Sequence, residues 1–224
     1  MNRALPVAVV GVGIAIAALA QSKDFSPPPP AWQVALQGTT STAAGKAIVT
    51  SGKGAAIACA GCHGANGIAP AGTPFPRLAG LPMEYVAKQL FDYREGTRPN
   101  PMMAPIAKAL TDADIASVAR YYASMDPPAA QTGATGWSAR ARHLARYGDN
   151  ALAIPACIDC HGSDATGGGP ILPPLGQSAS YTTAQLQAFR SGERHNDGDT
   201  VMREMSKRMS DADIKALADY YGGR

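Results

Sequence analysis

Two cysteine pairs, each followed directly by a histidine, are the residues of this chain best suited to chemistry. The segments CAGCH (residues 59–63) and CIDCH (residues 157–161) place the two thiols of each pair three positions apart. Such a motif can form a redox-active disulfide, a zinc site or the attachment point of a c-type haem. A thioredoxin-like disulfide needs strands around the motif, and no alternating run predicts them. A zinc ion needs a fourth ligand, for which no residue has a convincing spacing.

The haem interpretation gives a role to every residue of the motif. The two thiols add to the vinyl groups of the porphyrin, and the imidazole that follows points at the iron. Two copies in one chain therefore predict two covalently bound haem c groups. The predicted attachment and ligand residues are Cys59, Cys62 and His63 in the first copy, and Cys157, Cys160 and His161 in the second.

The two motifs belong to an internal repeat. Tyr85, Gln89, Leu90, Arg94, Gly96 and Arg98 are matched at the same spacings by Tyr181, Gln185, Leu186, Arg190, Gly192 and Arg194. The segment TDADI at 111–115 is likewise matched by SDADI at 210–214. The repeat predicts two homologous domains, at 37–127 and 128–224, joined through a segment rich in Pro, Gly, Thr and Ala.

Both units predict short helices and an all-α fold. Thr111 and Ser210 are good N-caps, with Asp114 and Asp213 three residues on as an acidic form of the capping box. Apolar residues at i, i+3, i+4 and i+7 follow each cap, as in an amphipathic helix. The other predicted helices span 84–94, 183–190, 42–49 and 138–147.

Methionines are the candidates for the remaining iron ligand. They are Met102 and Met103 in the first unit, and Met202, Met205 and Met209 in the second. Met103 and Met202 share one distance, eight residues, before the caps Thr111 and Ser210, so the repeat favours this pair over its neighbours. A thioether ligand raises the reduction potential and leaves no open coordination position. This arrangement favours the passage of single electrons over catalysis at the metal.

Residues 1–36 read as a leader followed by a proline-rich spacer. A short positive head, Met1 to Arg3, precedes the uncharged apolar segment 4–20, which ends in the cleavage-like Ala18-Leu19-Ala20. Because that segment lies at the lower edge of a membrane span, two expectations stay open: a cleaved signal peptide, or a retained anchor helix. Both place the rest of the chain in the periplasm. The formal net charge of +3 with no basic run gives no indication of nucleic-acid binding.

These motifs resemble the cytochrome c4 family of dihaem cytochromes c, and the resemblance covers nearly all of residues 38–223. It rests on ACAGCHG, PRLAG, YVAKQLFDYREGTR and MAPIAKALTDADIASVARYY in the first unit, and on IPACIDCHG, PPLGQ, YTTAQLQAFRSGER and MREMSKRMSDADIKALADYY in the second. It implies two tandem class I cytochrome c domains related by a pseudo-two-fold axis. It also implies a non-catalytic protein that carries single electrons between a quinol-oxidising bc-type complex and a terminal oxidase.

The resemblance further implies that the carbonyls of Pro76 and Pro173 accept hydrogen bonds from Nδ1 of His63 and His161. Guanidinium groups suit the haem propionates, and the candidates are Arg94, Arg98, Arg190 and Arg194. One departure from the repeat is a loop, ERHNDGDT at 193–200, that is three residues longer than its counterpart.

Two other functions stay open. The chain could be the haem subunit of a flavoprotein or quinoprotein dehydrogenase, because such subunits resemble the same family. A dihaem peroxidase would need one iron without a sixth protein ligand, which the matched methionines disfavour. His195, in the longer loop, is a weaker alternative to Met202, whereas His143 is expected at the surface.

Overall fold

The computed structural model describes residues 28–128, 137–162, 169, 171, 172 and 174–222. The predicted signal or anchor helix at 4–20 lies outside these residues. Within the described part of the chain, no helix has the length and apolar character needed to cross a membrane.

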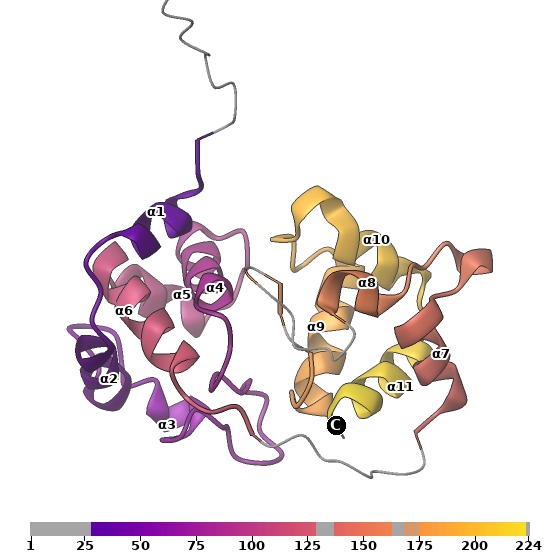
Figure 1. Ribbon diagram of the computed structural model, residues 1–224, viewed down its shortest axis with the longest axis horizontal. Coiled ribbons are helices and arrows are strands. Elements are labelled where there is room, and N and C mark those ends of the chain that lie inside the picture. The colour runs from indigo at the N-terminus through magenta and orange to yellow at the C-terminus, as the bar shows by residue number, and fades with distance from the viewer. Residues whose placement is uncertain (1–27, 129–136, 163–168, 170, 173, 223–224) are drawn as a thin grey trace, which may run out of the picture.

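The described residues form two helical lobes that lie side by side (Figure 1). The first lobe contains α1 (Ala31–Gln37), α2 (Thr42–Ser51), α3 (Ala60–His63), α4 (Met83–Glu95), α5 (Met103–Lys108) and α6 (Asp112–Ala123). The second contains α7 (Ala139–Tyr147), η1 (Asn150–Leu152), α8 (Cys157–His161), α9 (Ala179–Ser191), η2 (Gly198–Thr200), α10 (Val201–Arg208) and α11 (Asp211–Gly222). The only β pairing among the described residues is two isolated bridges, so the all-α prediction is confirmed.

Each lobe has its own apolar core, built on the helices that the caps and periodicity predict. In the first lobe α6 packs against α2 and α4, and in the second α11 packs against α7 and α9. The buried stripe on α6 includes Ile115, Val118 and Tyr122, and Ile214 and Leu217 repeat it on α11. Removing such side chains from water supplies the main driving force for closing a small helical unit.

The closing helix of each lobe begins at the predicted cap. The amide of Asp114 donates to Oγ1 of Thr111 at 3.2 Å, and the amide of Thr111 donates to Oδ2 of Asp114 at 3.1 Å. The same reciprocal pair joins Ser210 and Asp213, with both distances at 3.1 Å. These bonds satisfy amide groups that a helix start leaves without intrahelical partners.

Asp114 makes the stability of the first lobe depend on pH. Burial raises the pKa of Asp114, but hydrogen bonds from Lys53 and Thr111 outweigh that effect and hold the pKa below its usual value. A carboxyl with a depressed pKa in the folded state stabilises the fold fully above the unfolded pKa, about 3.9. That contribution is lost as the pH falls through the folded pKa. We therefore expect Asp114→Asn to flatten the fall in stability below about pH 4, measured by urea unfolding at a series of pH values. A fall in stability as steep as that of the wild type in Asp114→Asn would contradict this role of Asp114.

Candidate haem sites and the interface between the lobes

A cavity of about 370 Å³ in the first lobe brings together the residues predicted to hold the first haem. Cys59, Cys62, His63 and Met103 all line it, although forty residues separate the histidine from the methionine in sequence. Its size lies in the range of about 300–1,000 Å³ that is usual for pockets holding small organic ligands. The walls are mainly apolar, as a macrocyclic ring requires.

His63 is held in the tautomer that an iron ligand needs. It ends α3, is buried, and its Nδ1 lies 2.9 Å from the carbonyl oxygen of Pro76. A carbonyl can only accept, so Nδ1 carries the proton and the lone pair of Nε2 is left for a metal. Burial lowers the pKa of His63, and the bond to Pro76 opposes that shift only in part. The neutral imidazole is therefore the favoured form.

The second lobe repeats this arrangement with one correction. Nδ1 of His161 lies 2.8 Å from the carbonyl oxygen of Leu172, one residue before the predicted acceptor Pro173, which lies outside the described residues. The repeat had aligned Pro173 with Pro76, but the loops between histidine and acceptor differ in length, so the register shifts by one residue. Burial again lowers the pKa of His161.

The methionines of the first lobe differ in exposure. Met102 and Met103 both line the cavity, but Met102 is 50% exposed whereas Met103 packs against the core. Both of their amides donate to Oδ1 of Asn100, which fixes the start of α5. This difference favours Met103 as the inward-facing sulfur.

In the second lobe Met202 is half-buried and packs against the core. The repeat aligns Met205 and Met209 with Ile106 and Leu110, which form walls of the first cavity, and both methionines are buried. They therefore occupy wall positions. His195 is exposed, and its Nδ1 donates to the carbonyl of Glu193 in its own loop at 3.1 Å.

The four candidate arginines separate into two kinds. Arg94 and Arg190 form exposed ion pairs with Asp112 and Asp211, which start the closing helices. Arg98 and Arg194 are only 5% and 7% exposed and line the cavity. The ion pairs found among the described residues give neither of them a carboxylate partner.

Arg98 and Arg194 also cross-link the two lobes. Arg98 donates to Oε1 of Gln89 in its own lobe at 2.8 Å, and to Oε1 of Gln185 and the hydroxyl of Tyr181 in the other lobe at 2.6 and 2.8 Å. Arg194 donates to Gln185 at 2.7 Å and to Gln89 at 3.2 Å. Two buried cations that bond only to neutral acceptors lack the negative charge that would offset the cost of their burial. Anionic propionates of a haem would complete this donor set, so the residues present fit the group.

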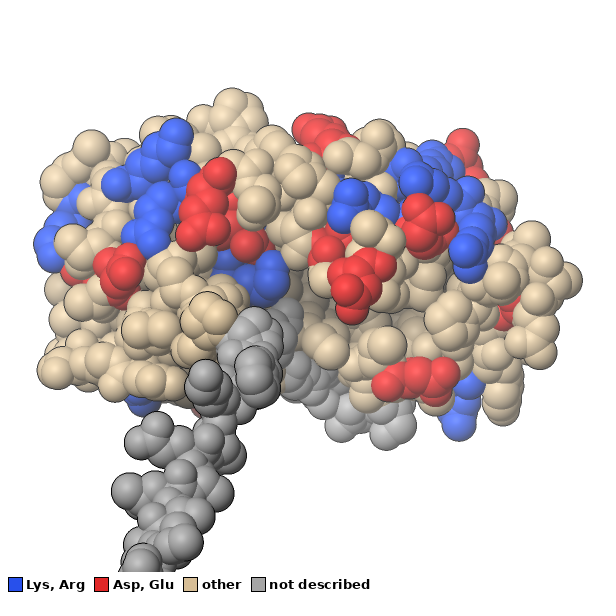
Figure 2. All heavy atoms as spheres, turned by 90° about the horizontal axis from the view of Figure 1, so that it is seen from above, with Lys and Arg blue, Asp and Glu red and all other residues tan. Residues whose placement is uncertain are grey.

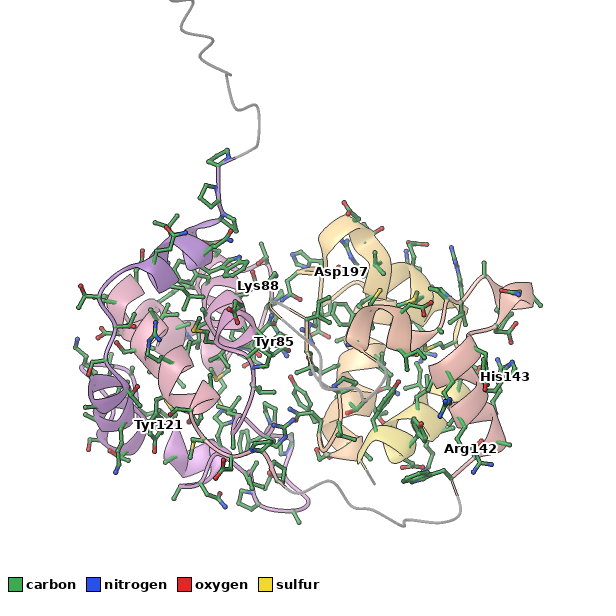
Figure 3. The ribbon with its side chains drawn as sticks, in the orientation of Figure 1. Tyr85, Lys88, Tyr121, Arg142, His143 and Asp197 are labelled. Atoms are coloured by element: carbon green, nitrogen blue, oxygen red, sulfur yellow. The ribbon has the colours of Figure 1, made fainter. Side chains whose placement is uncertain are left out.

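The longer loop of the second lobe, residues 193–200, forms further hydrogen bonds with the first lobe, which the repeat alone did not predict. Nδ2 of Asn196 donates to Oδ2 of Asp92 at 2.6 Å and to Oε1 of Gln89 at 2.9 Å, and Lys88 donates to the carbonyl of Asn196 at 2.8 Å. Figure 3 shows Lys88 and Asp197 on the facing sides of the two lobes.

Other chemically active side chains lie apart from these sites. None of the four cysteines forms a disulfide, so each is available for a thioether bond. No three His, Cys, Asp or Glu side chains of the described residues gather into a metal site of the zinc type.

His143 lies at the far end of the second lobe, beside Arg142 (Figure 3). On the face seen in Figure 2, positive and negative side chains interleave, and no patch of one sign dominates.

Known proteins match both lobes. The cytochrome c family model matches residues 42–126 and 147–221. A thiosulfate dehydrogenase electron acceptor of Stutzerimonas stutzeri (strain A1501) is 44% identical over 184 residues, covering 79% of this chain and 84% of the relative. The crystal structure of reduced recombinant cytochrome c4 from Pseudomonas stutzeri matches with a TM-score of 0.73 and 31% identity, over 83% of this chain and 99% of that one.

A third match is to a longer protein. The structure of thiosulfate dehydrogenase (TsdBA) from Marichromatium purpuratum gives a TM-score of 0.74 and 36% identity over 81% of this chain, which spans 40% of that chain. Together with the two Cys-x-x-Cys-His motifs, these similarities show that the chain belongs to the cytochrome c family, as a tandem dihaem electron-transfer protein of the cytochrome c4 type with two covalently bound c-type haems.

Proposed function

We propose that this protein accepts single electrons from a periplasmic dehydrogenase of the thiosulfate dehydrogenase class and passes them on to a respiratory acceptor. The observation that carries the proposal is the 44% identity to a thiosulfate dehydrogenase electron acceptor, against 37% to a cytochrome c4 of Pseudomonas aeruginosa. The match to part of a thiosulfate dehydrogenase chain supports the same pairing. The sequence had suggested a flavoprotein or quinoprotein dehydrogenase as the partner, and the proposal names a thiosulfate dehydrogenase in its place.

The residues of each lobe have assigned roles in this proposal. Cys59 and Cys62 hold the first haem through thioethers, with His63 and Met103 as its iron ligands. The corresponding residues of the second lobe are Cys157, Cys160, His161 and Met202. When bound, each haem supplies an iron that gains and loses one electron. The protein keeps the histidine neutral, aims its Nε2, and encloses the ring in an apolar cavity.

Arg98 and Arg194 make the interface between the lobes suitable for electron transfer. Their buried guanidinium groups line the first cavity, where they would offset the cost of burying the carboxylates of a bound haem. Because each arginine also bonds to the glutamine of the opposite lobe, the two lobes would hold their haems in one fixed relation. A fixed relation supports rapid exchange of one electron between the two irons.

A second candidate function is the shuttling of electrons between a quinol-oxidising bc-type complex and a terminal oxidase. The match that covers 99% of a cytochrome c4 chain favours it. The two candidates share the periplasmic location, with residues 4–20 either removed or retained as an anchor, and they differ in the electron donor.

The donor can be identified by mixing the oxidised protein with a purified thiosulfate dehydrogenase and thiosulfate, and following the α-band of the ferrous haem. We expect full reduction, with two electrons taken up per chain, within the turnover time of the enzyme. Omitting either thiosulfate or the enzyme should leave the protein oxidised. Reduction only by a quinol-oxidising bc-type complex would refute the dehydrogenase pairing and favour the shuttle.

A further inference from the structure

The peptide group between Pro76 and Arg77 is hydrogen-bonded at both ends, and one of its partners comes from the other lobe. Its carbonyl oxygen accepts the Nδ1 proton of His63 at 2.9 Å. Its N–H donates to Oε1 of Gln177, in the second lobe, at 3.1 Å. A continuous chain of hydrogen bonds therefore runs from Gln177 through one peptide to the histidine of the first cavity.

Gln177 is buried between the lobes, and its side-chain amide is held by hydrogen bonds to Arg77. It is 1% exposed, and its Nε2 donates to the carbonyl of Arg77 at 2.9 Å, so its amide makes two bonds to one residue. The guanidinium of Arg77 in turn donates to the carbonyl of Leu175 at 2.9 Å and to that of Ala79. Because a buried amide without partners is costly, the docked lobes hold Gln177 against this peptide.

A hydrogen bond to a peptide N–H makes the carbonyl oxygen of the same peptide a stronger acceptor, by about 10–30% per bond in a polarised chain. A stronger acceptor at Nδ1 makes an imidazole ligand more basic. A more basic ligand stabilises ferric over ferrous iron and lowers the reduction potential. Gln177 is thus in a position to lower the potential of the first haem.

The second lobe has no counterpart to this chain. In the register set by Pro76 and Leu172, Gln177 aligns with Leu81, whose apolar side chain cannot form such a hydrogen bond. The acceptor for His161 is the carbonyl of Leu172, and the nitrogen of that peptide belongs to Pro173, which has no hydrogen to donate. The polarising bond can therefore exist on one side only.

We infer that Gln177 is a positioning residue for the iron ligand of the first haem, so that the reduction potential of this haem depends on how the second lobe is docked. The inference rests on the role proposed above for His63. A chain of hydrogen bonds would then join the iron ligand of the first haem to the second lobe, and the second haem would have no such chain.

The test is Gln177→Met in the full chain carrying both haems. Methionine fills similar space but accepts no bond of comparable strength from Arg77. At a fixed ambient potential, we expect the ratio of ferrous to ferric iron in the first haem to rise about threefold. This corresponds to an upward shift of its reduction potential by about 28 mV, at 59 mV per tenfold change. The second haem should not shift. Paramagnetic NMR separates the two haems during the titration, and hydrogen exchange at the Arg77 amide should become faster.

Two companion variants complete the design. Gln177→Glu keeps an acceptor oxygen for Arg77 and should return the first haem to the wild-type potential or below it. Ser180→Ala changes an exposed side chain three residues from Gln177 and should leave the first potential unchanged. Equal shifts of both haems, or faster exchange at Arg77 without a shift, would overturn the inference.

Should Gln177→Met fail to bind both haems, Gln177→Asn withdraws the amide from Arg77 and is measured in its place. The spectrum of the wild-type protein separates this test from the role of His63. A high-spin ferric first haem in the wild type would count against the ligand assignment, whatever the potentials of the variants.

Discussion

Replacing Met103 with leucine is expected to lower the potential of the first haem by a few tenths of a volt, within the range of about 0.8 V that axial ligands span. Thioether sulfur favours ferrous iron, so its loss favours the ferric state. Leucine keeps the apolar volume but leaves the sixth position of the iron open. Carbon monoxide should then bind the reduced first haem readily. Redox titration and carbon monoxide difference spectra provide the measurement.

Met102→Leu is the matched control, because the side chain is adjacent in sequence but half exposed. It should leave the potential and the carbon monoxide spectrum as in the wild type. In the second lobe, Met202→Leu should behave like Met103→Leu, and Met205→Leu like the control. An open iron in Met102→Leu, with Met103→Leu unaffected, would reverse the assignment made from the repeat.

Replacing both Cys59 and Cys62 with alanine is expected to remove the first haem and to unfold the first lobe. Without its haem, the first lobe would keep a mainly apolar cavity of about 370 Å³ unfilled, and unfilled apolar volume in a core costs several kcal/mol of stability. The whole stability of a domain is about 5–15 kcal/mol. A lobe that must carry this cavity empty therefore has little or no stability left. The intact mass should fall by one haem, and urea unfolding should lose the transition of the first lobe.

The corresponding change at Cys157 and Cys160 should remove the second haem. A chain that keeps two haems after the first double substitution, or that unfolds as the wild type does, would contradict covalent attachment at Cys59 and Cys62. The mass and the unfolding curve test the site and the fold separately.

Much of the fold could be predicted from local patterns. The caps at Thr111 and Ser210 fix where the closing helices begin, because their reciprocal bonds are made within four residues. Helices such as α4 followed from their apolar periodicity. The repeat carried this information to the second lobe and selected Met103 over the exposed Met102. Short helices such as α1, α5 and α10 were not predicted, because six to eight residues give too little periodicity.

The interface could not be predicted in the same way, because its contacts join residues about one repeat apart. Four arginines shared one pattern, and only the tertiary structure separates the buried Arg98 and Arg194 from the two that form surface ion pairs. Gln177 was missed, although the repeat contained a signal. Its aligned position is Leu81, and a polar residue at a position that is apolar in the other copy indicates a contact that the other copy lacks.

The wall of the first cavity includes Leu172, Gln177, Tyr181 and Gln185 from the second lobe. A porphyrin in this cavity would therefore contact both lobes, and we expect it to reach Cys59 and Cys62 more easily before the lobes have packed against each other. During maturation, attachment of the first haem should accordingly precede packing of the second lobe against the first. The second lobe would then cover the haem that is already attached.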